Sequence, residues 1–160
     1  MSKKVSVRID ERLIHGQVAA LWSKALHLNR IVVVDNEVIK NDMQKMLLKT
    51  ATPAGIKLSI ISAQRAADNF NAGKYDEETT LVIVKGPATL REIKDAGYSF
   101  ESVNVGNITS KPGSKTITKQ IYVTDEQIQD FKDLAALTNF YVQLVPDAAP
   151  KEFMSMLVDQ

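Results

Sequence analysis

The sequence predicts an α/β fold: a three-layer, open, mainly parallel sheet of about seven strands with helices on both faces. Three observations support this prediction. Short runs rich in β-branched residues alternate along the chain with segments of helical periodicity. Several of these runs are almost continuously apolar, as expected of parallel strands that are covered on both faces. The alternating order of strands and helices is typical of a doubly wound domain.

Four strands are expected where β-branched and aliphatic residues are densest, at residues 4–8, 30–34, 57–61 and 80–84. Shorter candidates follow at residues 102–105, 120–123 and 141–144. The segment 106–119, which reads GNITSKPGSKTITK, is too rich in Gly, Ser, Thr and Lys for a buried element. We expect it to form a long loop, and loops of that kind are often functional or mobile.

The helices between these strands are indicated by apolar spacing and by end signals. The side chains expected to face the sheet recur every three or four residues: Ile14, Val18, Leu21 and Ala25 in the first helix, and Ile39, Met43 and Met46 in the second. The sequence also suggests N-caps and glycines near helix ends, which are Asn36, Ser62 and Thr124 for the former and Gly55, Gly73 and Gly97 for the latter.

Composition limits the classes of protein to which the chain can belong. Its 160 residues fit one domain, expected to span residues 1–160. A formal charge of +1 without a long basic run argues against a nucleic-acid partner. No apolar run approaches the about 20 residues that cross a bilayer, and the start lacks the apolar segment of a secretory signal. We therefore expect a cytoplasmic protein without direct membrane insertion.

The most reactive group of side chains follows the first strand, in residues 8–17 (RIDERLIHGQ). Open α/β sheets bind their ligands beyond the carboxyl ends of the strands. A phosphoryl group at this place would meet the N–H groups of the opening helical turn, the positive end of the helix dipole and the guanidinium of Arg12. His15 adds a nucleophile, because a neutral imidazole can attack phosphorus. The alternative is that His15 is an ordinary loop histidine.

The neighbours of His15 have supporting functions in this hypothesis. Asp10 would orient Arg12 or select the tautomer of the imidazole. Gly16 leaves room for phosphate oxygens or for a partner protein, and Gln17 follows it as a further candidate for phosphate binding or loop support. A simple ion pair between Arg8 and Asp10 at the strand end is an equal alternative for these two residues.

Four further residues are candidates for the rim of the site. Asp35 closes the second strand and can reach the same crevice, but a local role as the polar stop before the expected Asn36 cap is an alternative. Asn107, Lys111 and Lys115 belong to the polar segment, and the lysines would offer charge to an acidic partner. The alternative for this segment is a merely solvated loop.

The residues of the site also carry a family resemblance. The sequence RIDERLIHGQV at residues 8–18 closely resembles the signature of the IIB components of the mannose-fructose-sorbose family of bacterial sugar phosphotransferase systems. The segments VVVDN (32–36), NVGN (104–107) and KPGSKTITK (111–119) are similar to the family's pattern as well. The resemblance implies a mainly parallel, seven-stranded sheet with helices on both faces. Glu11 departs from the pattern, because many members have Asp there.

The resemblance implies that the chain is a protein-histidine phosphotransferase. His15 would accept a phosphoryl group on Nδ1 from a phosphorylated IIA protein and transfer it to a sugar that enters through the membrane components IIC and IID. Arg12 and loop amides would hold the phosphate, while Asp10 and Arg8 support the loop. The partners would keep the chain at the inner face of the membrane. We expect no cofactor and no metal, since the nucleophile and the leaving group are both imidazoles.

Two rival hypotheses use the same residues. In one, the chain is a non-enzymatic regulator that binds a phosphorylated ligand or partner at this site. In the other, it is a small hydrolase that uses His15 as a nucleophile and releases phosphate. Mannose, fructose, sorbose and N-acetylgalactosamine are all compatible with the sequence as the transported sugar.

Overall fold

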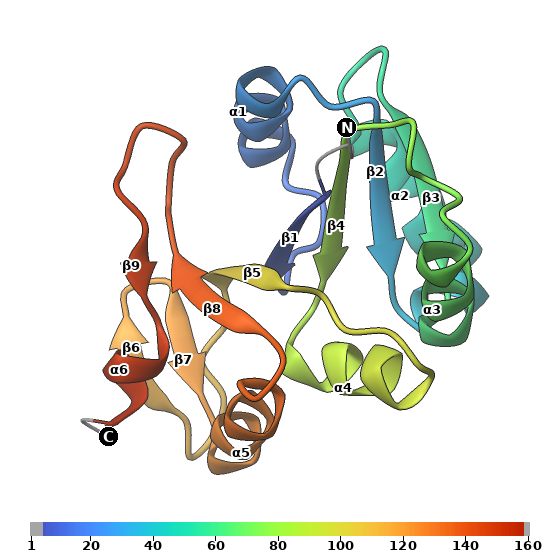
Figure 1. Cartoon of the computed structure of the whole chain (residues 1–160). Helices are drawn as coiled ribbons and strands as arrows, with labels where there is room; N and C mark the ends of the chain where they lie inside the picture. Colours follow the sequence, from blue (N-terminus) through green and yellow to red (C-terminus); the bar gives the residue numbers. More distant parts are fainter. Residues whose placement is uncertain (1–4, 159–160) are drawn as a thin grey trace.

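A computed structural model describes residues 5–158 and contains a seven-stranded sheet with the strand order β3-β2-β4-β1-β5-β8-β9 (Figure 1). Neighbouring strands are parallel except for β8 and β9, which are antiparallel. The strands are β1 (Val5–Asp10), β2 (Arg30–Val34), β3 (Lys57–Ile61), β4 (Thr80–Val84), β5 (Ser102–Asn107), β8 (Asn139–Val142) and β9 (Lys151–Glu152). This architecture confirms the predicted fold class.

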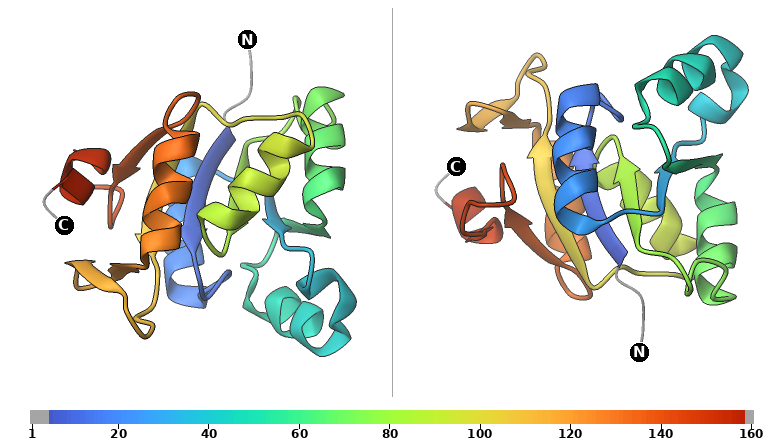
Figure 2. Two further views of the ribbon diagram at one scale, coloured as in Figure 1. Left: turned by 90° about the horizontal axis from the view of Figure 1, so that it is seen from below. Right: turned by 90° about the horizontal axis from the view of Figure 1, so that it is seen from above.

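The helices lie on both faces of the sheet. Figure 2 shows α3, α4 and α5 over one face in its left view and α1 over the opposite face in its right view. The helices are α1 (Gly16–Leu26), the short 3-10 helix η1 (Val38–Lys40), α2 (Asp42–Ala51), α3 (Ala63–Asn71), α4 (Pro87–Asp95), α5 (Asp125–Leu134) and α6 (Met154–Val158). Among residues 5–158, no helix combines the length and the apolar character that crossing a membrane requires.

The sheet separates two apolar clusters. Alternate side chains of a strand point to opposite faces, so Val7 and Ile9 of β1 join the cluster under α3, α4 and α5. The second cluster lies under α1 and α2 and contains Leu13, Ala19 and Leu28. Arg8 and Asp10 alternate with Val7 and Ile9, and therefore lie on the α1 face of the sheet. Charged side chains thus occupy the middle of the sheet on that face.

Several helix ends follow the local signals in the sequence. The side chains of Ser62 and Thr124 accept hydrogen bonds from backbone N–H groups in the first turns of α3 and α5, as predicted. Gly73 and Gly97 adopt positive φ angles just after α3 and α4. The predicted cap at Asn36 is wrong: its Oδ1 accepts a hydrogen bond from the N–H of Ala63 in α3, 2.9 Å away.

The polar segment 106–119 is not one long loop. Lys115–Thr118 form strand β6, which pairs with β7 (Ile121–Val123) as a separate antiparallel sheet. Ile108 and Ile121 are fully buried and form a parallel bridge, so the start of the segment is attached to the body of the fold. The predicted strand at residues 120–123 is therefore real but belongs to this hairpin, and β9 takes the seventh place in the main sheet.

Candidate functional site

The segment that carries His15 lies at the carboxyl end of β1, between β4 and β5 in the sheet. β1 leads into α1 on one face of the sheet, whereas its neighbour β4 leads into α4 on the opposite face. Connections that diverge in this way leave an open crevice at the strand ends, where ligands of α/β proteins bind. The topology therefore places residues 11–15 where the sequence predicts a phosphate site.

The carboxylate of Asp10 organises this loop from below. It is almost fully buried and accepts hydrogen bonds from the backbone N–H of Arg12 at 3.0 Å, from Arg12 Nε at 2.9 Å and from Arg12 Nη2 at 2.8 Å. Such a two-point contact fixes the plane of a guanidinium, not only its charge. The side chain of Arg12 remains 37% exposed, so that it can still contact a ligand from solvent.

Two apolar side chains anchor the loop to the body of the fold. Leu13 and Ile14 are buried in the cluster beneath α1 and α2. Leu13 has a φ angle of 63°, in the left-handed region that costs a residue other than glycine about 1–2 kcal/mol. Its N–H donates to the carbonyl of Asp10 at 2.9 Å, which closes the turn. Burial of both side chains holds the turn in this conformation and leaves the next residue, His15, at the surface.

His15 is the N-cap residue of α1 and its side chain is exposed. The backbone carbonyl of His15 accepts the N–H of Ala19 at 2.8 Å, whereas its imidazole makes no capping hydrogen bond. The first turn of α1 contains no acidic residue, so the positive end of the helix dipole is not neutralised locally. His15 thus precedes a first helical turn that has no side-chain cap, an arrangement suited to an anion.

Gly16 and Gln17 form the exposed start of α1. A Cβ added to Gly16 would meet no atom within 4 Å, so the space beside it is open. The fold of this chain therefore does not require glycine here, and the open space is available to a ligand or a partner protein. No hydrogen bond within the described chain involves the side chain of Gln17, which leaves its predicted role without a structural partner.

Glu11 connects this loop to the segment after β5. Its carboxylate accepts hydrogen bonds from the N–H of Thr109 at 3.1 Å and from the Thr109 hydroxyl at 2.6 Å, and it forms an ion pair with Lys111. Burial by itself would raise the pKa of Glu11, but the hydrogen bonds from Lys111 and Thr109 outweigh it and hold the pKa below its ordinary value. The sequence hypothesis gave neither Glu11 nor Thr109 a role in shaping the site.

Asn107 contributes to the same connection through its backbone. Its carbonyl accepts the N–H of Glu11 at 3.0 Å, whereas its side-chain Oδ1 is buried without a hydrogen-bond partner in the described chain. Lys111 lies beside the loop, where its charge is paired with Glu11. The structure therefore brings Asn107 and Lys111 to the site as parts of its wall.

Arg8 lies beneath the loop and is 5% exposed. Its Nε donates to Asp10 at 3.3 Å, so the predicted ion pair at the strand end is present. Burial lowers the pKa of Arg8, and the charge of Asp10 opposes that effect. A Cβ on Gly106 would lie 2.3 Å from Cζ of Arg8, which explains the glycine in the NVGN segment. The guanidinium thus packs directly on the backbone of β5.

Asp35 and Lys115 have partners elsewhere. Asp35 is buried at the end of β2 and accepts the N–H groups of Glu37 and Val38 at 2.9 and 3.0 Å. This arrangement fits the local alternative, a polar stop that begins η1. Lys115 lies on β6 and pairs with Asp125 at 3.0 Å. Neither side chain contacts residues 10–15 by a hydrogen bond or an ion pair in the described structure.

Comparison with known proteins gives a consistent result. The family described as PTS system sorbose subfamily IIB component matches residues 5–160. The PTS system sorbose-specific EIIB component of Lacticaseibacillus casei is 35% identical over 130 residues, which cover 81% of this chain and 79% of that protein. The PTS system mannose-specific EIIAB component of Escherichia coli strain K12 is 33% identical over 129 residues, which cover 81% of this chain and 40% of that protein.

The fold leads to the same family. The crystal structure of the IIBSor domain of the sorbose permease from Klebsiella pneumoniae has a TM-score of 0.89 to this chain, with 26% identity and 98% of both chains covered. Sequence and fold thus agree over nearly the whole chain and confirm the resemblance seen in residues 8–18. The chain belongs to the sorbose subfamily of PTS system IIB components, which are phosphotransferase domains in sugar uptake.

Proposed function

We propose that this chain is a phosphocarrier that accepts a phosphoryl group on His15 from a phosphorylated IIA protein and passes it to a sugar. One observation carries the proposal: an exposed imidazole stands at the N-terminus of α1, three residues after an arginine that Asp10 holds by two hydrogen bonds. The exposed position suits a residue that must meet two macromolecular partners in turn. A small-molecule enzyme would instead favour an enclosed pocket.

The chemistry of the first step requires little of the protein. Nδ1 of His15 attacks the phosphorus of the donor phosphohistidine in line, the new P–N bond forms, and the donor imidazole leaves as its own P–N bond breaks. Phosphoryl transfer of this kind has a loose transition state, so that positioning and charge stabilisation supply most of the catalysis. Arg12 and the first N–H groups of α1 would bind the equatorial oxygens of the phosphoryl group.

The second step transfers the group from Nδ1 of His15 to a sugar hydroxyl. The P–N bond breaks as the P–O bond forms, and the hydroxyl proton passes to a base. We propose that the sugar is presented by the membrane components IIC and IID, and that His15 approaches them at the inner face of the membrane. The family assignment supports a partnership of this general kind, and the name of the E. coli relative, EIIAB, joins an A and a B component in one protein.

A label-and-chase experiment tests the proposal. The protein is incubated with labelled phosphoenolpyruvate, the general phosphotransfer proteins and IIA, and is then isolated and mixed with sugar and membranes that contain IIC and IID. We expect an acid-labile label on the protein in the first stage and its movement to the sugar in the second. A regulator would bind without covalent label, and a hydrolase would release free phosphate before the chase. Absence of label on the intact protein would contradict the proposal.

A further inference from the structure

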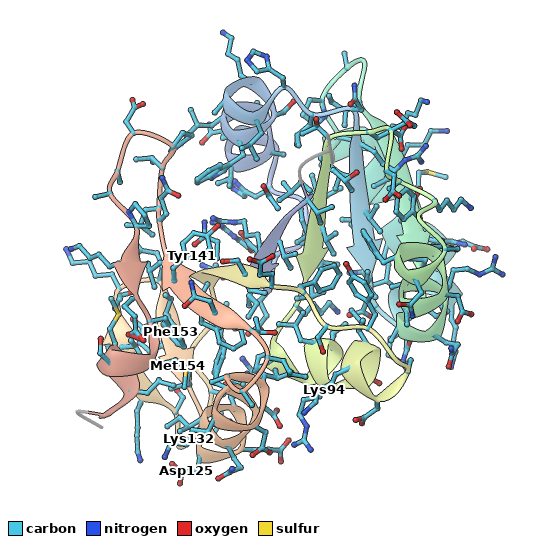
Figure 3. The ribbon with its side chains drawn as sticks, in the orientation of Figure 1. Lys94, Asp125, Lys132, Tyr141, Phe153 and Met154 are labelled. Atoms are coloured by element: carbon cyan, nitrogen blue, oxygen red, sulfur yellow. The ribbon has the colours of Figure 1, made fainter. Side chains whose placement is uncertain are left out.

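A small cavity lies on the α1 face of the sheet, separate from the exposed imidazole of His15. It has a volume of about 100 Å³, and the residues that line it include Ser6 and Arg8 of β1, Trp22 of α1 and Tyr141 of β8. Tyr141 is labelled on β8 in Figure 3. A water molecule occupies about 30 Å³ in the liquid, so the cavity is large enough for a small ion together with water.

Two nitrogen atoms of the residues that line this cavity are buried without a hydrogen-bond partner in the described chain: Nη1 of Arg8 and Nε1 of Trp22. Arg8 is 5% exposed and Trp22 is 8% exposed. Both groups can only donate, because a guanidinium and an indole N–H have no acceptor. A buried donor without a partner is destabilising, because it has lost its hydrogen bonds to water and gained none in the protein. The two nitrogens therefore indicate a missing acceptor.

The charge around the cavity indicates what kind of acceptor is missing. Arg8 and Arg12 share the single carboxylate of Asp10, which leaves one positive charge without a counter-charge. Among the described residues that line the cavity, Arg8 is the only one with a charge. A buried charge is tolerated when it is paired, and an anion would supply the missing pair.

Asn104 also lines the cavity, but its amide group is engaged elsewhere. The side chain of Asn104 forms two hydrogen bonds with the backbone of Gln143, at 2.9 and 3.0 Å, and these satisfy its amide group. Burial raises the pKa of Tyr141, while the charge of Arg8 opposes this shift. The phenol is therefore protonated near neutral pH, and its hydroxyl is a further donor for an acceptor in the cavity.

We propose that this cavity is a binding site for one small monovalent anion of the size of chloride, held by Arg8 and Trp22. The site is distinct from the phosphate position at the N-terminus of α1, because its lining residues come from the sheet and from the body of the helix. The two sites are connected through Asp10, whose carboxylate accepts hydrogen bonds from both Arg8 and Arg12. An anion on Arg8 would neutralise the buried charge and leave Asp10 to Arg12.

The chain offers an internal reporter, because Trp22 is its single tryptophan. We would titrate the protein with sodium chloride in place of sodium gluconate at constant ionic strength, gluconate being too bulky for the cavity. We expect a saturable change in Trp22 emission and a higher Tm in chloride, since a ligand that binds only the folded state stabilises it. Identical emission and identical Tm in the two salts would overturn the proposal.

Three variants distinguish chloride binding in the cavity from a general effect of salt. Arg8→Met should weaken the chloride response about tenfold or more, because it removes a charged hydrogen bond. Arg30→Met is the matched control: Arg30 is half-buried and pairs with Glu78 away from the cavity, so its loss should leave the response intact. Ser6→Leu fills the cavity while it retains Arg8, and should abolish the response even if Arg8→Met fails to fold. An unchanged response in Ser6→Leu would overturn the proposal.

Discussion

The carboxylate of Asp10 binds the guanidinium of Arg12 through two hydrogen bonds, Oδ1 to Nε at 2.9 Å and Oδ2 to Nη2 at 2.8 Å. This pair joins the buried end of β1 to the exposed loop that carries His15. Because Asp10 also accepts from Arg8, one buried carboxylate pairs with two guanidinium groups. The position of Arg12, the proposed phosphate-binding residue, therefore depends on the buried side chain of Asp10.

Asp10→Asn should be strongly destabilising. The substitution preserves the shape of the side chain but removes its charge, and Arg8 would then be buried without a counter-charge. Breaking a buried ion pair in this way costs about 3 kcal/mol or more. Urea unfolding would measure the loss in unfolding free energy. Asp42→Asn is the control, because Asp42 is exposed and its ion pair with Lys45 is 3.6 Å long, so that a loss of similar size there would contradict this account.

Arg12→Lys should slow the phosphorylation of His15 by about tenfold or more. Lysine keeps the charge, but it cannot reproduce the planar two-point contact with Asp10 or offer a fork to phosphate oxygens. The rate of label incorporation from phosphorylated IIA would measure this effect. Arg65→Lys, on the exposed surface of α3, should leave the rate unchanged. Equal rates for Arg12→Lys and the wild type would show that the guanidinium does not hold the phosphoryl group.

Gly106→Ala should cost about 1–3 kcal/mol of unfolding free energy, because the new Cβ would overlap the buried guanidinium of Arg8. Gly16→Ala is the matched substitution in open space and should change stability by less than about 0.5 kcal/mol. Thermal or urea unfolding of the two variants would test the contrast. A smaller loss for Gly106→Ala than for Gly16→Ala is the opposite of what this packing requires.

Glu11→Gln should destabilise the protein in a manner that depends on pH. The pKa of Glu11 in the folded state lies below its ordinary value of 4.5. Its carboxylate therefore contributes stability above that pH, and the contribution is lost as the pH falls through the lower folded-state value. We expect a difference of about 1 kcal/mol from the wild type at neutral pH, since the site is partly exposed. Urea unfolding should show this difference shrink in acid, whereas a constant difference would contradict the ion pair with Lys111.

The parts of the fold that were predictable from the sequence are those that local patterns determine. The strands at 30–34, 57–61 and 80–84 have the predicted bounds. For β2 and β4 the reason is that buried parallel strands need continuous apolar runs, whereas the edge strand β3 is only half-buried. Strand β9 escaped notice, since Lys151–Glu152 is a two-residue edge strand with no apolar signal. Strand β8 begins at Asn139 and not at Tyr141, where the apolar pattern is clearer.

The predicted helix faces were less accurate. Met43 and Met46 are 74% and 69% exposed, although their spacing indicated a buried face. In α1 the buried residues are Ala19 and Trp22, while Leu21 is 46% exposed. Periodicity identifies an apolar stripe on a helix, but tertiary packing determines which part of that stripe is covered. A short stretch of sequence therefore does not reveal which of its apolar residues are buried.

The candidate site was predictable to the extent that it is contiguous. Residues 8–17 lie where the strand-helix connection was expected, and the contact between Asp10 and Arg12 spans only two residues. The hydrogen bonds that Glu11 accepts from Thr109 and Lys111 join residues about a hundred positions apart, so no spacing rule could reveal them. The capping of Ala63 by Asn36 was missed for the same reason.

The phosphorylation of histidine variants tests the central claim most directly. The chain has two histidines, and His27 at the C-cap of α1 provides the matched control for His15 at its N-cap. After incubation with phosphoenolpyruvate, the general phosphotransfer proteins and IIA, intact-protein mass spectrometry would count the phosphoryl groups. We predict one acid-labile group on the wild type and on His27→Ala, and none on His15→Ala. A phosphoryl group on His15→Ala, or its loss from His27→Ala alone, would contradict this account.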